Sequence, residues 1–280
     1  MMKILFICTG NTCRSVMAQQ FAEHTVSEYS EGFEFASAGL CAREGAPFDP
    51  GASRALKAAG IEPKEHCARQ LTTDMGNAAD LIVCMNENQA QTLKIKFPYI
   101  ETPIIFLKGT GDPFGGTPET YARSLDAIKR GVLPLLVTIS PFSERDVDEV
   151  AEAERLCFSH PWRKEDFALA AENEAYIGFT ARIGKRLAGY IFISELLGEA
   201  ELLNIAVLPE LRRNGIARLL MQKLCEVCEK RGASVCFLEV RSSNDGASKL
   251  YEDFGFKRIA IRKNYYEAPS EDAVIMRKEW

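Results

Sequence analysis

The 280-residue sequence contains no apolar run near the ~20 residues needed to cross a bilayer, so we expect no membrane partner. It shows no signal-peptide pattern, because Met1 leads directly into Lys3 and a short apolar strand. Neither half is basic: residues 1–138 carry a net charge of −2 and the rest −3, which argues against direct nucleic-acid binding. Internal repeats and low-complexity segments are also missing. These absences predict a globular protein of the cytoplasm.

Metal-ligand patterns are missing as well. The three histidines, His24, His66 and His160, lack the spacing of metal ligands, so we expect no metal cofactor. The nine cysteines are odd in number and irregularly spaced, which argues against a disulfide framework and fits a reducing compartment. Cys225 and Cys228 form one Cys-x-x-Cys pair, but no second pair accompanies them, so core packing is preferred over zinc.

Two different patterns of secondary structure divide the chain near residues 139–142. Before this point strands are expected over 4–8, 33–37, 81–85 and 104–107, and helices over 15–29, 49–59 and 118–137. Such alternation predicts a parallel sheet covered on both faces. After it, strands over 174–182, 187–196, 201–207 and 235–240 mix with helices over 146–157, 215–230 and 245–253. We therefore predict an α/β protein with a parallel-sheet domain over 1–140 and a mixed α+β domain over 141–280.

A cysteine and an arginine frame the loop that follows the first strand. Cys8 and Arg14 are separated by five residues, and a helical pattern follows. Inward-facing N–H groups and a helix N-terminus attract an anion, and the same field favours the reactive thiolate. Arg14 can hold two phosphoryl oxygens in its planar fork, and the Ser15 hydroxyl can help the sulfur to leave. The other loop residues expected to surround the phosphate are Thr9, Gly10, Asn11, Thr12 and Cys13.

Transfer of a phosphoryl group to sulfur also needs an acid for the leaving group. Asp112 precedes a proline in a glycine-rich loop, and the proline stiffens the backbone that aims the carboxyl group. We expect Asp112 to protonate the leaving group and then to activate water against the phospho-cysteine. Taken singly, Cys8 would more often be a buried structural thiol and Asp112 a turn residue. The combination of Cys8, Arg14 and Asp112 makes a catalytic site the favoured interpretation.

Residues 1–138 resemble the low-molecular-weight protein-tyrosine-phosphatase family. Four segments carry the resemblance in the expected order: 8–15, 37–39, 66–72 and 112–114. The resemblance implies a flavodoxin-like parallel sheet, with Cys8 as nucleophile, Arg14 as the transition-state arginine and Asp112 as acid and base. It also implies a phosphorylated protein as substrate. Val16 departs from the family, which usually has proline there; we expect this to alter how the helix begins and not the chemistry.

Two features bear on which phosphorylated residue is cleaved. Thr12 stands where tyrosine-directed members usually have an aliphatic residue and protein-arginine phosphatases of the family have threonine. Gly115 and Gly116 follow the Asp-Pro-Phe segment, where tyrosine-directed members usually place aromatic residues. Phosphoarginine is therefore preferred over phosphotyrosine. Arsenate reduction is a third alternative, although Cys67 and Cys84 make no obvious resolving pair.

Cys13 has two open interpretations. It can form a reversible disulfide with Cys8 that protects the nucleophile from over-oxidation. It can equally be an inward-facing thiol without a redox role. The sequence does not choose between them.

A second anion-binding loop is predicted in the other half. A strand ends near Val207, a turn follows Pro209, and the segment 213–218 opens a helix. Backbone N–H groups there can hold a pyrophosphate, and the arginines add positive charge. Alone, such a loop is a weak signal. The segments 238–241 and 250–256, with Asn244 between them, complete a stronger pattern.

This pattern resembles the GNAT superfamily of N-acetyltransferases over about 143–280. The segments 160–162, 204–207, 262–266 and 271–273 look like the ribosomal-protein-alanine N-acetyltransferase group. The resemblance implies acetyl-CoA as co-substrate and a protein N-terminus, favoured to be a ribosomal protein alanine, as acceptor. It implies Glu239 as general base and Tyr251 as the acid that protonates the departing thiolate.

The same resemblance implies how the cofactor is held. The acetyl-pantetheine arm would lie along Ile205, Ala206 and Val207, and Asn244 would contact the cofactor. The pyrophosphate would be bound by Arg213, Asn214, Gly215, Ile216, Ala217 and Arg218. Taken alone, Tyr251 would more often be a core tyrosine and Glu239 a solvated carboxylate. The favoured interpretation is a bifunctional enzyme; the alternative leaves one domain as a binding module.

Overall fold

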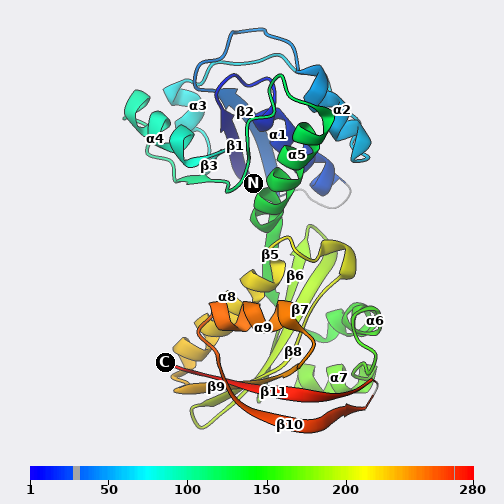
Figure 1. Ribbon diagram of the computed structural model, residues 1–280. Coiled ribbons are helices and arrows are strands. Elements are labelled where there is room, and N and C mark those ends of the chain that lie inside the picture. Colours follow the sequence, from blue (N-terminus) through cyan, green and yellow to red (C-terminus); the bar gives the residue numbers. More distant parts are fainter. Residues whose placement is uncertain (28–31, 268) are drawn as a thin grey trace. The chain divides into compact units, whose positions relative to one another are not determined.

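The structure is a computed structural model that describes residues 1–27, 32–267 and 269–280 (Figure 1). The chain divides into two compact units. Unit 1 comprises Met1–Leu136 together with the short segment Ile183–Lys185, and unit 2 comprises Val137–Arg182 and Arg186–Trp280. Among the described residues, no helix combines the length and apolar character needed to span a bilayer.

Unit 1 is built on a parallel sheet, which confirms the predicted flavodoxin-like arrangement. In spatial order its strands are β2 (Phe33–Gly39), β1 (Met2–Cys8), β3 (Leu81–Cys84) and β4 (Ile104–Phe106). The central strand β1 is buried from Ile4 to Cys8, as expected for an apolar run covered on both faces. Cys8 pairs with Gly39 at the end of the ladder, so the nucleophile candidate lies at the carboxyl edge of the sheet.

Helices cover both faces of this sheet. They are α1 (Arg14–Ser27), α2 (Pro50–Ala58), α3 (Thr73–Asn77), α4 (Glu87–Lys96) and α5 (Pro118–Val132). The helices α1, α2 and α5 pack against one another, whereas α4 lies beside β3 and β4 and buries Leu93 with Ile7 (Figure 1). The predicted helix over 15–29 is α1, and its positions 28 and 29 lie outside the described residues.

The last helix of unit 1 is shorter than predicted. The sequence suggested a helix over 118–137, but α5 ends at Val132 and a 3-10 turn over Leu133–Leu136 follows. Pro134 has no backbone N–H and its ring clashes with an α-helical continuation, which explains the early end. Val137 already belongs to the first strand of unit 2, β5 (Val137–Pro141).

Unit 2 has a mixed sheet, as predicted. In spatial order it contains β10 (Lys257–Glu267), β11 (Ser270–Glu279), β9 (Val235–Arg241), β8 (Glu199–Val207), β7 (Arg186–Leu196), β6 (Tyr176–Ile183) and β5. The strand β8 runs antiparallel to β7 but parallel to β9. The parallel pairing covers Glu199–Leu202 against Val235–Leu238, and both strands continue beyond it. The ladder between β8 and β9 ends there, so the β8 backbone beyond Leu202 is not paired with β9.

The helices of unit 2 lie on both faces of its sheet. They are α6 (Val147–Cys157), α7 (Lys164–Glu172), α8 (Ile216–Arg231) and α9 (Asp245–Asp253). Phe167 of α7 joins Tyr190 and Phe192 of β7 in the core beneath α6. The helix α8 packs against β7 and β8. The sequence predicted α6, α8 and α9 but not α7.

Candidate active sites

The loop between β1 and α1 closes around the sulfur of Cys8. The Ser15 Oγ lies 3.0 Å from the Cys8 Sγ, and the backbone N–H of Asn11 donates to the same sulfur over 3.2 Å. Asn11 adopts a left-handed backbone with φ of 53°, which turns its N–H inward. Cys8 is buried. Both groups lie within hydrogen-bonding distance of the sulfur, an arrangement that suits a nucleophilic cysteine.

Asn11 is held in this conformation by segments far away in sequence. Its side-chain amide nitrogen donates to Ser15 over 3.0 Å and to Ser37 over 2.9 Å, and its amide oxygen accepts the backbone N–H of Arg69 over 2.8 Å. The His66 ring nitrogen lies 2.9 Å from the Asn11 carbonyl oxygen. Burial lowers the pKa of His66, which favours a neutral ring. The segments 37–39 and 66–72 therefore brace the loop, a role that sequence reasoning did not assign.

Arg14 and Asp112 meet across the mouth of the loop. Their side chains approach to 2.5 Å, with Arg14 buried and Asp112 half-exposed. The Asp112 segment is anchored where Ser124 Oγ donates to the Gly111 carbonyl over 3.1 Å. Arg14 and Asp112 line a cavity of about 360 Å³ with Thr9 and a polar wall from Asn86, Asn88, Gln89 and Thr92. The structure thus brings the predicted arginine and acid together beside the loop.

Cys13 lies in the loop, is buried, and is not among the residues that line the cavity. Burial and the nearby carboxylate of Asp49 raise the pKa of its thiol to about 12. Hydrogen bonds to Asp49 and Tyr121 contribute to this environment. At neutral pH the Cys13 sulfur is therefore protonated and a poor nucleophile.

Thr12 is half-buried, and its carbonyl oxygen accepts the backbone N–H of Asp49 over 3.0 Å.

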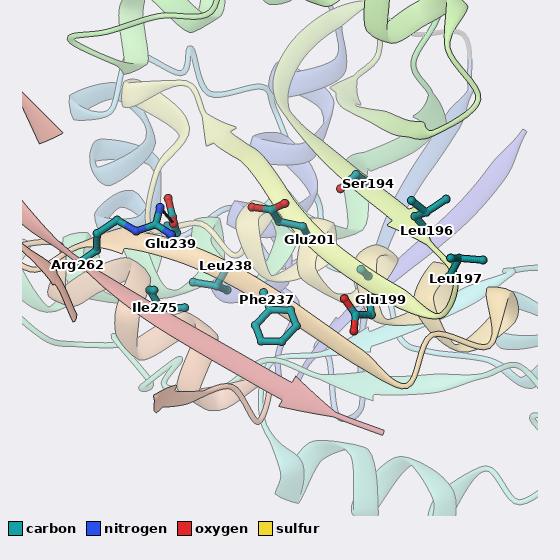
Figure 2. A pocket seen from close by; sticks show the side chains of 11 residues that line it. Ser194, Leu196, Leu197, Glu199, Glu201, Phe237, Leu238, Glu239, Arg262 and Ile275 are labelled. Atoms are coloured by element: carbon teal, nitrogen blue, oxygen red, sulfur yellow. Dashed lines mark ion pairs between the residues drawn. The ribbon is translucent and has the colours of Figure 1, made fainter. Parts of the chain in front are cut away.

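In unit 2, the Glu239 side chain of β9 lines a cavity of about 660 Å³ (Figure 2). Paired residues on neighbouring strands share a sheet face, so Glu239 projects on the same face as its β11 partner Ile275. The Arg262 guanidinium of β10 lies 2.6 Å from the Glu239 carboxylate, and Figure 2 shows the two side chains meeting. A hydrogen bond to Glu239 raises the pKa of Tyr265. The predicted base thus has a cationic and a phenolic neighbour.

The predicted acid, Tyr251, lies on α9. Its side chain is buried, and its ring centroid is 6.2 Å from that of Phe256. Burial raises the pKa of Tyr251 well above its ordinary range, so its hydroxyl keeps its proton at neutral pH. A phenol in this state can donate a proton but cannot act as a base.

The predicted pyrophosphate loop is a tight turn at the start of α8. Arg213 and Gly215 both have left-handed backbones, with φ of 65° and 82°, and α8 begins directly afterwards at Ile216. The first N–H groups of α8 are therefore presented at the turn, as an anion site requires. Asn214 holds the turn, since its side-chain amide donates to the Leu211 carbonyl over 3.2 Å.

Two other residues predicted to contact the cofactor, Arg218 and Asn244, use their side chains in contacts within the protein. The Arg218 guanidinium lies 2.6 Å from the Asp253 carboxylate and covers the ring of Phe254. The Asn244 side chain accepts the Ala247 backbone N–H over 3.1 Å and so caps α9. Ile205, Ala206 and Val207 lie where β8 has separated from β9. Backbone groups of this site are therefore better placed for a ligand than the side chains of Arg218 and Asn244.

Within the described residues, no group of three or more His, Cys, Asp or Glu side chains is arranged to hold a metal ion.

Comparisons with known proteins find two families in one chain. Residues 3–143 match the low molecular weight phosphotyrosine protein phosphatase family, and residues 147–256 match the acetyltransferase (GNAT) family. Over 141 residues the chain is 38% identical to the ribosomal protein bS18-alanine N-acetyltransferase of Escherichia coli (strain K12), covering 50% of this chain and 95% of that protein.

Solved structures are similar to each half. The crystal structure of the ribosomal-protein-S18-alanine N-acetyltransferase from Escherichia coli is 36% identical, with a TM-score of 0.49, covering 51% of this chain and 93% of that one. The YwlE arginine phosphatase from Geobacillus stearothermophilus is 31% identical, with a TM-score of 0.44, covering 48% of this chain and 90% of that one.

Proposed function

Because the chain belongs to the low molecular weight phosphotyrosine protein phosphatase family in its first half and to the GNAT acetyltransferases in its second, we propose that each half is a working enzyme with its own substrate. The first is a cysteine-dependent protein phosphatase. The second transfers an acetyl group from acetyl-CoA to a protein N-terminus, in our proposal a ribosomal protein alanine. We assign the phosphatase to residues 1–140, the acetyltransferase to 141–280, and the protein to the cytoplasm.

The phosphatase proposal depends on the position of Cys8 between Asn11 and Ser15. The Cys8 sulfur attacks phosphorus and forms a sulfur–phosphorus bond as the bond to the leaving group breaks. Loop N–H groups and the Arg14 fork hold the phosphoryl oxygens while charge shifts among them. An incoming phosphate takes the place of Asp112 at Arg14. The carboxyl group of Asp112, released from Arg14, can then donate a proton to the leaving group.

Asp112 acts twice in this scheme. In the first step its carboxyl group gives a proton to the leaving atom. In the second step the carboxylate takes a proton from water, which attacks phosphorus and displaces the Cys8 sulfur. The Ser15 hydroxyl, 3.0 Å from that sulfur, donates a hydrogen bond to the departing thiolate. The products are inorganic phosphate and the regenerated enzyme.

Phosphoarginine is the substrate we favour for unit 1. Its guanidinium N–H groups need acceptors, and the cavity beside Asp112 is lined by the Asn88 amide and the Thr92 hydroxyl, both of which can accept. Thr12 supports the same choice, because protein-arginine phosphatases of the family have threonine at this position. Phe114, which is 71% exposed near Asp112, instead favours phosphotyrosine, because its ring can flank a phenyl group.

A direct comparison of substrates tests this choice. Phosphate release from phosphoarginine and phosphotyrosine peptides is measured for the wild-type chain and for Thr12→Ile, with Cys8→Ser as the inactive control. We expect the ratio of kcat/KM values to favour phosphoarginine and to fall roughly tenfold or more in Thr12→Ile. A ratio that favours phosphotyrosine overturns the preference. Thiol-dependent conversion of arsenate to arsenite would instead support the reductase alternative.

The acetyltransferase proposal depends on Glu239 and Tyr251. The α8 N-terminus, with its left-handed Gly215, fits a pyrophosphate, and the separated end of β8 offers backbone groups to a pantetheine arm. Acetyl-CoA, when bound there, supplies the thioester. Glu239 takes a proton from the acceptor ammonium, directly or through water, so that the amine becomes nucleophilic. Tyr251 holds its proton for the departing thiolate.

Acetylation is tested with peptides that begin with alanine, including one that copies the N-terminus of the ribosomal protein bS18. Transfer should require acetyl-CoA and should fall about 10²- to 10⁴-fold in Glu239→Gln. Unchanged turnover in Glu239→Gln overturns the assignment of the base. If either unit shows no turnover while binding its peptide, that unit is a binding module instead.

A further inference from the structure

Arg262 occupies the place at Glu239 that an acceptor amine has to reach. Its guanidinium nitrogen lies 2.6 Å from the Glu239 carboxylate, and both side chains line the same cavity (Figure 2). The guanidinium carbon lies 4.9 Å from the ring centroid of Tyr265, which itself hydrogen-bonds to Glu239. The carboxylate is thus already occupied by a cation of this chain.

A base must come within hydrogen-bonding distance of the proton that it removes, directly or through one water. The acceptor arrives as an ammonium ion for part of its population at neutral pH. Its charge and donor groups match those that Arg262 presents to Glu239. The two cations therefore compete for one carboxylate.

We propose that Arg262 is a displaceable counter-ion at the acceptor site, and that the ammonium group of the acceptor binds by taking its place at Glu239. The inference rests on the proposed acetyltransferase function of unit 2. Arg262 is then a specificity-determining residue, because an acceptor binds only if its ammonium group competes with the guanidinium for Glu239. A neutral molecule that takes its place leaves the Glu239 carboxylate without a cationic partner.

The surroundings of Arg262 allow it to move. Its side chain is 52% exposed, whereas that of Glu239 is 22% exposed. The strand β10 lies at the edge of its sheet, and its pairing with β11 shifts register between Arg262 and Tyr266. Asn264, between them, has a left-handed backbone with φ of 50°. An exposed ion pair on an irregular edge strand is weak, so an incoming cation can break it.

Other carboxylates can receive the displaced guanidinium. Glu199 and Glu201 of β8 line the same cavity (Figure 2). In the part of the chain that the structure describes, neither of them makes an ion pair. Of the two, Glu201 is paired with Phe237 of β9, and Glu239 lies two residues further along that strand. Moving Arg262 toward Glu201 keeps its charge compensated while the ammonium takes Glu239.

The test uses the full chain and varies the Ala-starting peptide and acetyl-CoA independently. Arg262→Gln removes the competing cation, so the KM of the peptide should fall roughly two- to fivefold, the factor that an exposed ion pair corresponds to. The KM of acetyl-CoA should stay unchanged. Arg262→Lys keeps a cation and should remain near the wild-type value.

The matched control is Arg258→Gln. Arg258 lies on the same strand with a side chain 54% exposed, and it pairs with Glu252, outside the cavity lining. Its loss should change neither KM. Glu201→Gln should raise the KM of the peptide in the wild-type background, because the displaced guanidinium loses its second partner. In the Arg262→Gln background the same change should have no effect.

The outcomes separate the inference from the proposed function. A peptide KM that stays constant or rises in Arg262→Gln, with acetyl transfer intact, overturns the displacement alone. A rise in both KM values would indicate a purely structural role for Arg262. Absence of transfer by the wild-type chain overturns the acetyltransferase assignment, and with it this inference.

Discussion

The Tyr190 hydroxyl donates a hydrogen bond to the carboxylate of Glu154 inside the core of unit 2. The same carboxylate accepts the backbone N–H of Trp162 over 3.0 Å and the side-chain amide of Asn204 over 3.1 Å. Glu154 is 1% exposed. One buried carboxylate therefore ties α6 to β7, to β8 and to the segment before α7. The sequence offered no signal for this role.

Removal of the Glu154 carboxylate should destabilise unit 2 strongly. Glu154→Ala leaves several buried donors without an acceptor, and we expect it to lower the free energy of unfolding by about 3 kcal/mol or more. Glu154→Gln keeps one acceptor oxygen and should lose about 1–2 kcal/mol. Both tryptophans, Trp162 and Trp280, belong to unit 2, so their fluorescence during urea unfolding reports on this unit.

The control for this measurement is Glu152→Ala on the same helix. The Glu152 side chain is 68% exposed and pairs with Arg155 at the surface. Its loss should change the free energy of unfolding by less than about 0.5 kcal/mol. Equal effects of the Glu152 and Glu154 changes would show that the buried hydrogen bonds contribute nothing measurable.

The stability of unit 2 should also depend on pH through Glu154. Burial raises the pKa of its carboxyl group in the folded protein above the ordinary value of the unfolded chain. The folded state therefore holds the proton more tightly, and the resulting stabilisation is complete below the unfolded pKa. It is lost as pH rises through the folded pKa. Wild-type stability, relative to Glu154→Gln, should thus decline from about pH 4.5 upward. Parallel stability curves for the two proteins would contradict this.

Much of the fold followed from local patterns, and the exceptions have physical reasons. The apolar run from Ile4 to Cys8 and the alternation of strands and helices were sufficient to predict the parallel sheet. The helix α4 was missed because it buries little beyond Gln89, Ala90 and Leu93 and so lacks a broad apolar face.

The relationships within the sites were harder to predict because they join residues far apart in sequence. Arg262 and Glu239 lie on β10 and β9, with β11 between them in the sheet, so no spacing rule links them. Asn11 is held by Ser37 of β2 and by Arg69 from a later loop. Individual residue types could be recognised from motifs, but which partner each one contacts is decided by tertiary packing.

Ser15 should matter most in the second step of the phosphatase reaction. Its hydroxyl lies 3.0 Å from the Cys8 sulfur and can stabilise the departing thiolate. In Ser15→Ala we expect kcat to fall about 10²-fold, a typical loss for one hydrogen-bond donor, while phospho-cysteine accumulates. Rapid-quench kinetics and mass spectrometry of the trapped protein measure both quantities. Thr25→Ala, at the far end of α1, serves as control, and a fall in kcat without accumulation would place Ser15 in the first step.

The cysteines of unit 1 should differ sharply in reactivity. Burial raises the pKa of both Cys13 and Cys84 to about 12, whereas Cys41 and Cys67 are exposed. Leaving aside the nucleophile Cys8, iodoacetamide at pH 8 should modify Cys41 and Cys67 first and leave Cys13 and Cys84 unmodified in the folded protein. Peptide mass spectrometry at timed intervals measures the four rates. Labelling of Cys13 as fast as Cys41 would contradict the inward-facing position of its thiol.

Tyr251 offers the most direct test of proton donation in unit 2. Burial raises the pKa of Tyr251, so the phenol stays protonated throughout the pH range in which the domain would work. Tyr251→Phe keeps the ring that packs near Phe256 and removes only the donor, so folding should be retained while kcat falls about 10²- to 10⁴-fold. The KM values of peptide and acetyl-CoA should change little, because the donated proton is needed only as the carbon–sulfur bond breaks. Tyr176→Phe, a surface change in the same unit, should leave kcat unaltered. If Tyr251→Phe retained wild-type turnover, the thiolate would have to leave without this proton, and the buried hydroxyl would be a packing feature alone.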